Sequence, residues 1–129
     1  MVAYSADLEE YVGRLTVAEE VDDYSDVAVW FADMVERYLS GADFVVIASN
    51  TVHLAVDEIE RRPWLPPVLH IADTVAASCR ERGFTKLGLV GTPHTMKQTW
   101  LLGRLRAHGL EVLVPESVDD MTEMCVRNY

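Results

Sequence analysis

Two short polar segments contain the residue types that can bind a carboxylate. Ser49-Asn50-Thr51-Val52-His53 follows the apolar run 43–48, and Gly91-Thr92-Pro93-His94-Thr95-Met96 follows the apolar run 86–90. Both place hydroxyl or amide side chains where a helix is expected to begin, and the free N–H groups and dipole of a helix N-terminus favour an anion. Ser, Thr and Asn are also the commonest helix N-caps. A purely structural role therefore stays open for both segments.

The remaining reactive residues give weaker patterns. Neither segment has the glycine spacing of a nucleotide-binding loop. His53 and His94 lie in the two polar segments and could act as acids or orient other groups, whereas His70 and His108 favour structural roles. None of these histidines has the spacing of a zinc site, so no metal is expected. Cys79 is predicted to be buried and inert within a helix.

Alternating helices and strands are expected to position the polar segments. Hydrophobic spacing predicts helices over 25–39, 52–61, 73–82 and 95–108, and strands over 43–48, 68–71, 86–90 and 110–114. Gly41 is expected to be a left-handed C-cap and Asp73 an N-cap. Residues 119–129 read as the opening of a further helix. This alternation predicts an α/β fold, a parallel sheet of βαβ units flanked by helices, in which ligands bind at the carboxyl ends of the strands.

Composition narrows the classes of partner. The 129 residues are 50% hydrophobic and 25% charged, as in a globular protein. The formal net charge of −10, from 11 Lys and Arg against 21 Asp and Glu, argues against nucleic acid or an anionic membrane surface as partner. No run of apolar residues has the length of a membrane span or a signal-peptide core. A cytoplasmic protein is expected.

Four segments in order resemble the aspartate/glutamate racemase superfamily. Gly41-Ala-Asp-Phe-Val-Val-Ile-Ala-Ser-Asn-Thr-Val-His53 is similar to its signature, roughly G-A-D-F, three hydrophobic residues, then A-C-N-T-x-H. Pro67-Val-Leu-His-Ile-Ala-Asp73 resembles a P-hydrophobic-L-H-I-x-D segment, and Lys86-Leu-Gly-Leu-Val-Gly-Thr-Pro-His-Thr-Met96 resembles V-G-L-L-G-T-x-x-T-M. Tyr4-Ser5-Ala6-Asp7-Leu8 is similar to an upstream Y-S-x-D-F segment.

The resemblance implies a cofactor-independent racemisation of a small acidic amino acid. In that family two α/β lobes hold the substrate, and two cysteines on opposite faces of the α carbon remove and return the proton. By this resemblance, the residues expected to bind the carboxylates of the substrate are Asn50, Thr51, Thr92 and Thr95. Ser5 and His53 are further candidates for the site. Family members usually form homo-dimers.

The chain departs from the family pattern at both cysteines. Ser49 stands at the position of the first catalytic cysteine, and a hydroxyl is a far poorer base than a thiolate at neutral pH. The second cysteine, in a G-C-T-E-like turn, has no counterpart, because Cys125 is not followed by Thr-Glu. The family's G-G-M-S-like opening segment is also missing. The expectation is therefore a partial chain, with residues 1–83 in a first lobe and residues 84–129 beginning a second.

Three functions remain open on these residues. The first is a racemase-family enzyme, seen here as a partial chain, with Ser49 replacing one base. With a thiol at the other face, the complete protein could favour one enantiomer. The second is a one-cysteine decarboxylation, which the superfamily also supports. The third is a catalytically impaired domain that binds carboxylates or pairs with another subunit. Because a partial sheet leaves strand edges unpaired, self-association is also expected.

Overall fold

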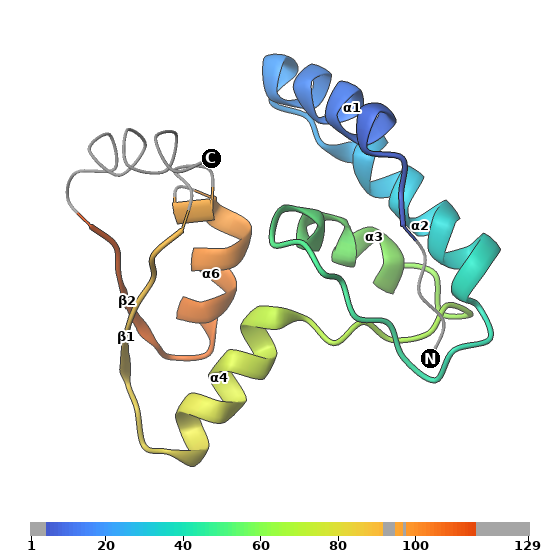
Figure 1. Cartoon of the computed structure of the whole chain (residues 1–129). Coiled ribbons are helices and arrows are strands. Elements are labelled where there is room, and N and C mark those ends of the chain that lie inside the picture. Colours follow the sequence, from blue (N-terminus) through green and yellow to red (C-terminus); the bar gives the residue numbers. More distant parts are fainter. Residues whose placement is uncertain (1–4, 92–94, 97, 116–129) are drawn as a thin grey trace. The chain divides into compact units, whose positions relative to one another are not determined.

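The computed structural model describes residues 5–91, 95–96 and 98–115 (Figure 1). The chain divides into two compact units, Met1–His70 and Ile71–Tyr129. Each unit is α/β in character and has its own parallel pairing of extended segments. The predicted α/β fold with a parallel sheet and flanking helices is confirmed. The expected lobe boundary after residue 83 concerns the family's two-lobe organisation and stays a prediction.

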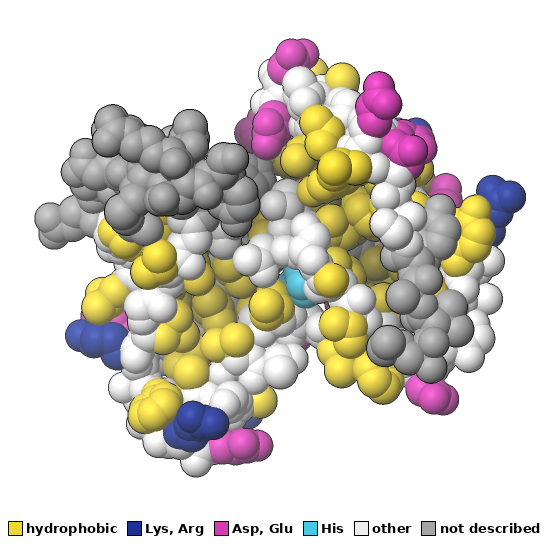
Figure 2. All heavy atoms as spheres, in the orientation of Figure 1, with side chains coloured by type: hydrophobic (Ala, Val, Ile, Leu, Met, Phe, Trp, Pro, Cys, Tyr) yellow, Lys and Arg dark blue, Asp and Glu magenta, His cyan; other side chains and the backbone are white. Residues whose placement is uncertain are grey.

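Two helices open the first unit. Helix α1, Leu8–Val21, begins where the side chain of Asp7 accepts a hydrogen bond from the backbone N–H of Glu10 at 2.9 Å. Helix α2 spans Ser25–Leu39, as predicted from its hydrophobic spacing. Arg14 of α1 joins the two helices, because its guanidinium pairs with Asp26 at 2.6 Å. The outward side chains of α1 include several acids, and Figure 2 shows Asp and Glu gathered around this end of the unit.

The connection after α2 differs from the prediction at Gly41. The residue that caps α2 is Ser40, which has right-handed dihedral angles, and Gly41 does not have a positive φ. A turn in which the N–H of Ala42 donates to the carbonyl of Leu39 at 2.9 Å closes the helix instead. The expected left-handed cap was therefore wrong, because this tighter turn needs no left-handed residue.

The two predicted strands of the first unit meet only at one bridge. Val45 pairs with Val68 in the parallel sense, through Val45 N–H to the Pro67 carbonyl at 2.8 Å and Leu69 N–H to the Val45 carbonyl at 2.9 Å. The parallel direction agrees with the predicted βαβ unit. The predicted helix between the strands is present as the 3₁₀ helix η1, Thr51–Ala55, followed by α3, Val56–Glu60.

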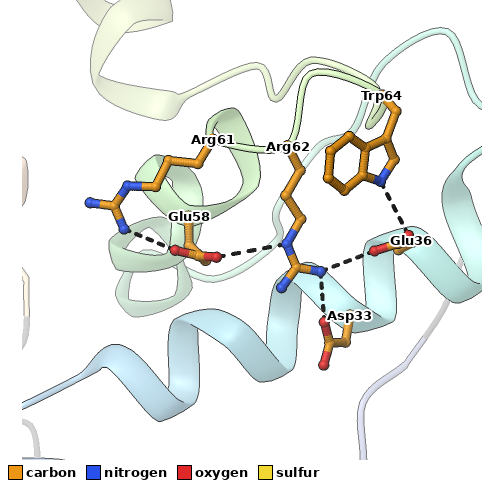
Figure 3. A network of polar contacts seen from close by, with 6 residues as sticks. All are labelled: Asp33, Glu36, Glu58, Arg61, Arg62 and Trp64. Carbon is orange, nitrogen blue, oxygen red and sulfur yellow. Dashed lines mark hydrogen bonds and ion pairs between the residues drawn. The ribbon is translucent and has the colours of Figure 1, made fainter.

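The core of the first unit lies between α2, η1, α3 and the bridged segments. Its buried side chains all come from residues 28–68 and include Ala32, Val35, Val56 and Ile59. A polar network joins α2 to α3 and to the segment that follows α3 (Figure 3). In it Arg62, whose side chain is 16% exposed, pairs with Asp33 at 2.6 Å, with Glu36 at 3.0 Å and with Glu58 at 3.7 Å. The indole N–H of Trp64 also donates to Glu36 at 3.1 Å.

The second unit contains two helices and two paired strands. Helix α4 spans Ile71–Glu81, strand β1 Lys86–Gly88, helix α6 Thr99–Ala107 and strand β2 Glu111–Leu113. The strands are parallel, with Leu87 opposite Val112. Parallel pairing across an intervening helix is the predicted βαβ arrangement. Thr95 and Met96 are helical, but Gln98 is extended, with φ −71° and ψ 123°. The helix predicted over 95–108 is thus interrupted at Gln98.

Asp73 has a different role from the predicted N-cap. It lies inside the first turn of α4, and both of its carboxylate oxygens accept hydrogen bonds from Arg104 of α6 at 2.8 Å. Nε2 of His108 lies 2.8 Å from the same carboxylate. The capping prediction was wrong because α4 begins at Ile71, before Asp73. The buried core of this unit comes from residues 72–112 and includes Cys79, whose burial was predicted.

Candidate functional site

The first polar segment folds as a tight turn into η1. Asn50 has helical dihedral angles, and its side chain makes no capping hydrogen bond. Its carbonyl accepts from the backbone N–H of His53 at 3.1 Å. Ser49 and Thr51 are half-buried and Asn50 is exposed. The side chain of Asn50 therefore does not cap the helix, which was the structural role left open for it.

His53 fixes the backbone of this turn from within. Its side chain is 4% exposed, and Nδ1 lies 2.8 Å from the carbonyl oxygen of Ser49. A carbonyl only accepts, so Nδ1 must carry the hydrogen and donate it. The ring also packs edge-on against buried His70, with centroids 4.8 Å apart and planes at 66°. The imidazole thus holds Ser49 in place through its main chain.

A cavity of about 430 Å³ lies beside the turn within the first unit. Most of its lining comes from apolar side chains of α2 and of the segment 45–48. Three hydroxyl-bearing residues, Ser5, Tyr11 and Ser49, also line it. Among the described residues of this lining, none carries a formal charge. The cavity therefore offers neutral hydrogen-bonding groups in apolar surroundings.

Tyr11 connects α1 to the polar turn. Burial raises the pKa of the Tyr11 phenol above its usual value, and Glu19 adds a smaller effect in the same direction. Hydrogen bonds from the side chains of Ser49 and Thr51 oppose that rise. Tyr11 and Ser49 line the same cavity.

Tyr11 lines the cavity of the candidate site, and no sequence motif indicated it. It belongs to an acidic helical stretch and lies outside every motif quoted above. Ser49, which lines the same cavity, is about forty positions away, and no local spacing can report that proximity.

The second polar segment is described only in part. Thr92 and His94 lie outside the described residues. Thr95 is helical and 6% exposed, and a Cβ added to Gly91 would lie 3.2 Å from its Cβ. Glycine at position 91 therefore permits the chain to pass close to Thr95. Thr95 belongs to the second unit, whereas Ser5, Ser49, Asn50, Thr51 and His53 belong to the first.

The described residues form neither a metal-binding cluster nor a membrane-spanning helix. No group of three or more His, Cys, Asp or Glu side chains in residues 5–91, 95–96 and 98–115 could hold a metal ion. In the same ranges no helix has the length and apolar character needed to cross a membrane.

Comparison with known proteins finds the same family over nearly the whole chain. A sequence model described as Asp/Glu/hydantoin racemase matches residues 14–127. The crystal structure of a candidate Asp/Glu racemase from Yersinia pestis is 31% identical, with a TM-score of 0.81 over 98% of this chain and 54% of that one. An aspartate racemase homologue from Pyrococcus horikoshii OT3 is also 31% identical, with a TM-score of 0.71 over 98% and 52%. The chain spans about half the length of these relatives.

Proposed function

The chain belongs to the Asp/Glu/hydantoin racemase family, and we propose that it takes part in cofactor-independent racemisation of a small acidic amino acid. The match over residues 14–127 carries this proposal. The turn at residues 49–53 adds local support, because Ser49 and Val52 of this turn line a cavity and Asn50 and Thr51 lie between them in sequence. We further propose that the protein is cytoplasmic and that it works as a homo-dimer, as members of this family usually do.

In the proposed site, Asn50 and Thr51 bind a carboxylate of the substrate. The Asn50 side chain is exposed and not engaged in capping, so its amide N–H group is available to a ligand. Neutral donors suit this role because the carboxylate itself carries the charge. A hydrogen bond from a neutral donor to an ionised carboxylate is stronger than one between two neutral groups. By the same resemblance, Thr92 and Thr95 of the second polar segment are separate candidates for carboxylate binding.

Ser49 then faces the α carbon of the substrate in place of a thiol. Proton abstraction needs a base whose pKa lies near the working pH, and an alcohol does not meet that condition. We therefore assign Ser49 to the weaker face of the site, where its hydroxyl holds or returns a proton rather than removing one. In the family pattern the opposite face carries a thiol, and a site that pairs such a thiol with a serine exchanges one enantiomer faster than the other.

Proton exchange at the α carbon tests this function directly. The chain is incubated in D2O with L- and D-aspartate and, separately, with L- and D-glutamate, and loss of the Cα proton is followed by NMR. The expected result is faster exchange of one enantiomer. Ser49→Cys is expected to increase exchange of the slower enantiomer, because a thiolate is the better base. Ser49→Ala is the matched control, since it removes the hydroxyl and adds no base.

Two outcomes would count against the proposal. Equal exchange of both enantiomers by the unaltered chain would show two working bases and would contradict the assignment of Ser49. No exchange of any amino acid by a folded sample, combined with saturable binding of aspartate or glutamate, would leave carboxylate binding as the function. Carboxylate binding without catalysis is the second candidate function, and Ser49 favours it because a serine hydroxyl is a poor base.

A further inference from the structure

We propose that the cavity beside the polar turn binds the apolar side chain of an amino acid of about the size of leucine. The chain then binds apolar amino acids in addition to acidic ones. The proposal rests on the proposed function in one respect, because Asn50 and Thr51 must bind the carboxylate of the same molecule. The side chain of that molecule is recognised by different residues, those that line the cavity.

The lining of the cavity is almost uniformly apolar. Apart from three hydroxyl-bearing residues, every residue that lines it has a hydrocarbon or thioether side chain. Helix α2 contributes Phe31 and Met34, both half-buried, and the segment 45–48 contributes a further apolar stretch. Among the described residues of this lining there is no lysine, arginine or histidine. A ligand in the cavity therefore meets hydrocarbon on most sides and no positive charge.

This chemistry separates two side chains of the same shape. Leucine carries an isopropyl group where aspartate carries a carboxylate. A carboxylate that leaves water without a cationic partner loses its hydration and gains no ion pair, which weakens binding strongly. An isopropyl group strengthens binding instead, roughly fourfold for each carbon that leaves water. The cavity therefore favours the apolar side chain, and the side-chain carboxylate of an acidic amino acid lies outside it.

The cavity has its size and one firm wall without a ligand. The ring of Phe31 packs edge-on against Tyr11 of α1, with centroids 5.7 Å apart, and against Trp30 at 4.9 Å. T-shaped aromatic pairs are favourable and directional, so they hold this wall in place. The volume of about 430 Å³ is typical of small-molecule sites, which span roughly 300–1,000 Å³. Because the apolar space is already formed, a side chain that enters it has little ordering cost to overcome.

The polar turn lies beside this space. Ser49 and Val52 line the cavity, and Asn50 and Thr51 lie between them in sequence. Nδ1 of His53 lies 2.8 Å from the carbonyl oxygen of Ser49 and fixes the turn at this place. An amino acid whose carboxylate meets the turn therefore has apolar space next to its side chain.

The dissociation constants of leucine and alanine test the proposal on the unaltered chain. Each enantiomer is titrated into ¹⁵N-labelled protein, and the backbone amide signals are followed by NMR. Alanine keeps the carboxylate and the ammonium group but lacks three of the carbons that would fill the cavity. Leucine is expected to bind about tenfold more tightly or better, in one enantiomer or in both. The Met34 methyl signal, identified by its loss in Met34→Lys, should shift with leucine and not with alanine.

Three substitutions separate the cavity from the carboxylate site, and the ratio of leucine to alanine affinity is the readout. Met34→Lys places a charge in the cavity, so the ratio should fall to near one. Val29→Lys adds the same charge at an exposed valine of α2 outside the described lining, and the ratio should stay unchanged. Asn50→Ala should weaken both amino acids by the same factor and also leave the ratio unchanged.

Two results would overturn the proposal. One is leucine bound no more tightly than alanine, or not at all, by the unaltered chain. The other is the same ratio in Met34→Lys and Val29→Lys, on samples that urea denaturation shows to be folded. Failure of the proposed function looks different, because the ratio does not depend on proton exchange. Tight leucine binding without Cα exchange of any amino acid would reject racemisation and leave the apolar subsite in place.

Discussion

At the scale of single residues, the candidate site is built around Ser49. His53, inside η1, donates to the Ser49 carbonyl at 2.8 Å. Tyr11 of α1 lines the same cavity as Ser49. Replacement of His53 is therefore expected to move the main chain of Ser49.

Replacement of His53 tests this contact. His53→Ala leaves the Ser49 carbonyl without its donor and empties the space of a buried ring, so we expect a loss of about 2–4 kcal/mol in the free energy of unfolding. Asn can place an amide N–H near the position of Nδ1, so His53→Asn should lose roughly half as much. Urea denaturation measures both values. Equal losses in the two variants would show that the hydrogen bond contributes little.

The sequence could predict the residues of the polar turn but not what holds them. Ser49, Asn50, Thr51 and His53 are consecutive or nearly so, and an apolar run precedes them, so local spacing was sufficient. Asp73 shows the limit of such reasoning, because an acid near the start of a helix suits both an N-cap and an ion pair. The partners Arg104 and His108 decide between these roles, and they lie more than thirty positions away.

At the scale of elements, helix positions were predicted better than strand lengths. The helix over 25–39 was predicted with its observed ends, because its apolar residues repeat at helical spacing. The apolar run 43–48 has the composition of a strand, yet only Val45 pairs. A strand is defined by its neighbours' hydrogen bonds, and those depend on segments far away in the sequence.

Two glycines of the second unit are expected to respond oppositely to alanine. Gly103 lies inside α6, and Gly109, with φ +81°, follows it. A Cβ would meet no atom within 4 Å at either position, so backbone conformation alone decides the outcome. Gly103→Ala should stabilise the chain by roughly 0.5–1 kcal/mol, and Gly109→Ala should destabilise it by about 1 kcal/mol. Thermal or urea unfolding checks both, and a loss of stability in Gly103→Ala would contradict the argument.

The network around Arg62 offers a comparison between adjacent arginines. Arg62 contacts acids of both α2 and α3, whereas Arg61, which is mostly exposed, pairs among the described residues only with Glu58. Isolated surface ion pairs contribute little, but a less exposed arginine shared by several carboxylates contributes more. Arg62→Ala should reduce the free energy of unfolding by about 1 kcal/mol more than Arg61→Ala, and the difference should shrink in high salt. Urea denaturation at low and high salt measures it; similar losses would exclude a special role for Arg62.

At the scale of the whole molecule, the extended segment of the first unit has one unpaired side. Val45 directs its hydrogen bonds toward residues 67–69, and among the described residues no backbone hydrogen bond reaches Phe44 or Val46. The side chain of Val46 is 65% exposed and that of Phe44 is also exposed. An apolar edge of this kind can pair with another chain.

A single substitution that adds a charge to this edge tests self-association through it. The chain is expected to form concentration-dependent species larger than a monomer, and Val46→Lys should reduce them because lysine disfavours edge pairing. Val29→Lys is the matched control, since it adds the same charge at an exposed valine of α2. Light scattering after size-exclusion chromatography measures the masses. A monomer at all concentrations, or an equal effect of both lysines, would rule out this edge as the contact.

The separation of the two hydrophobic cores has a consequence for synthesis. The first core uses residues 28–68 and the second uses residues 72–112, so neither takes a buried side chain from the other's stretch. On the ribosome the first core can therefore close while the second is still being translated, and at roughly 5–20 residues per second that interval lasts on the order of several seconds. A stalled ribosome carrying the first 70 residues beyond its exit tunnel should already present a protease-resistant unit.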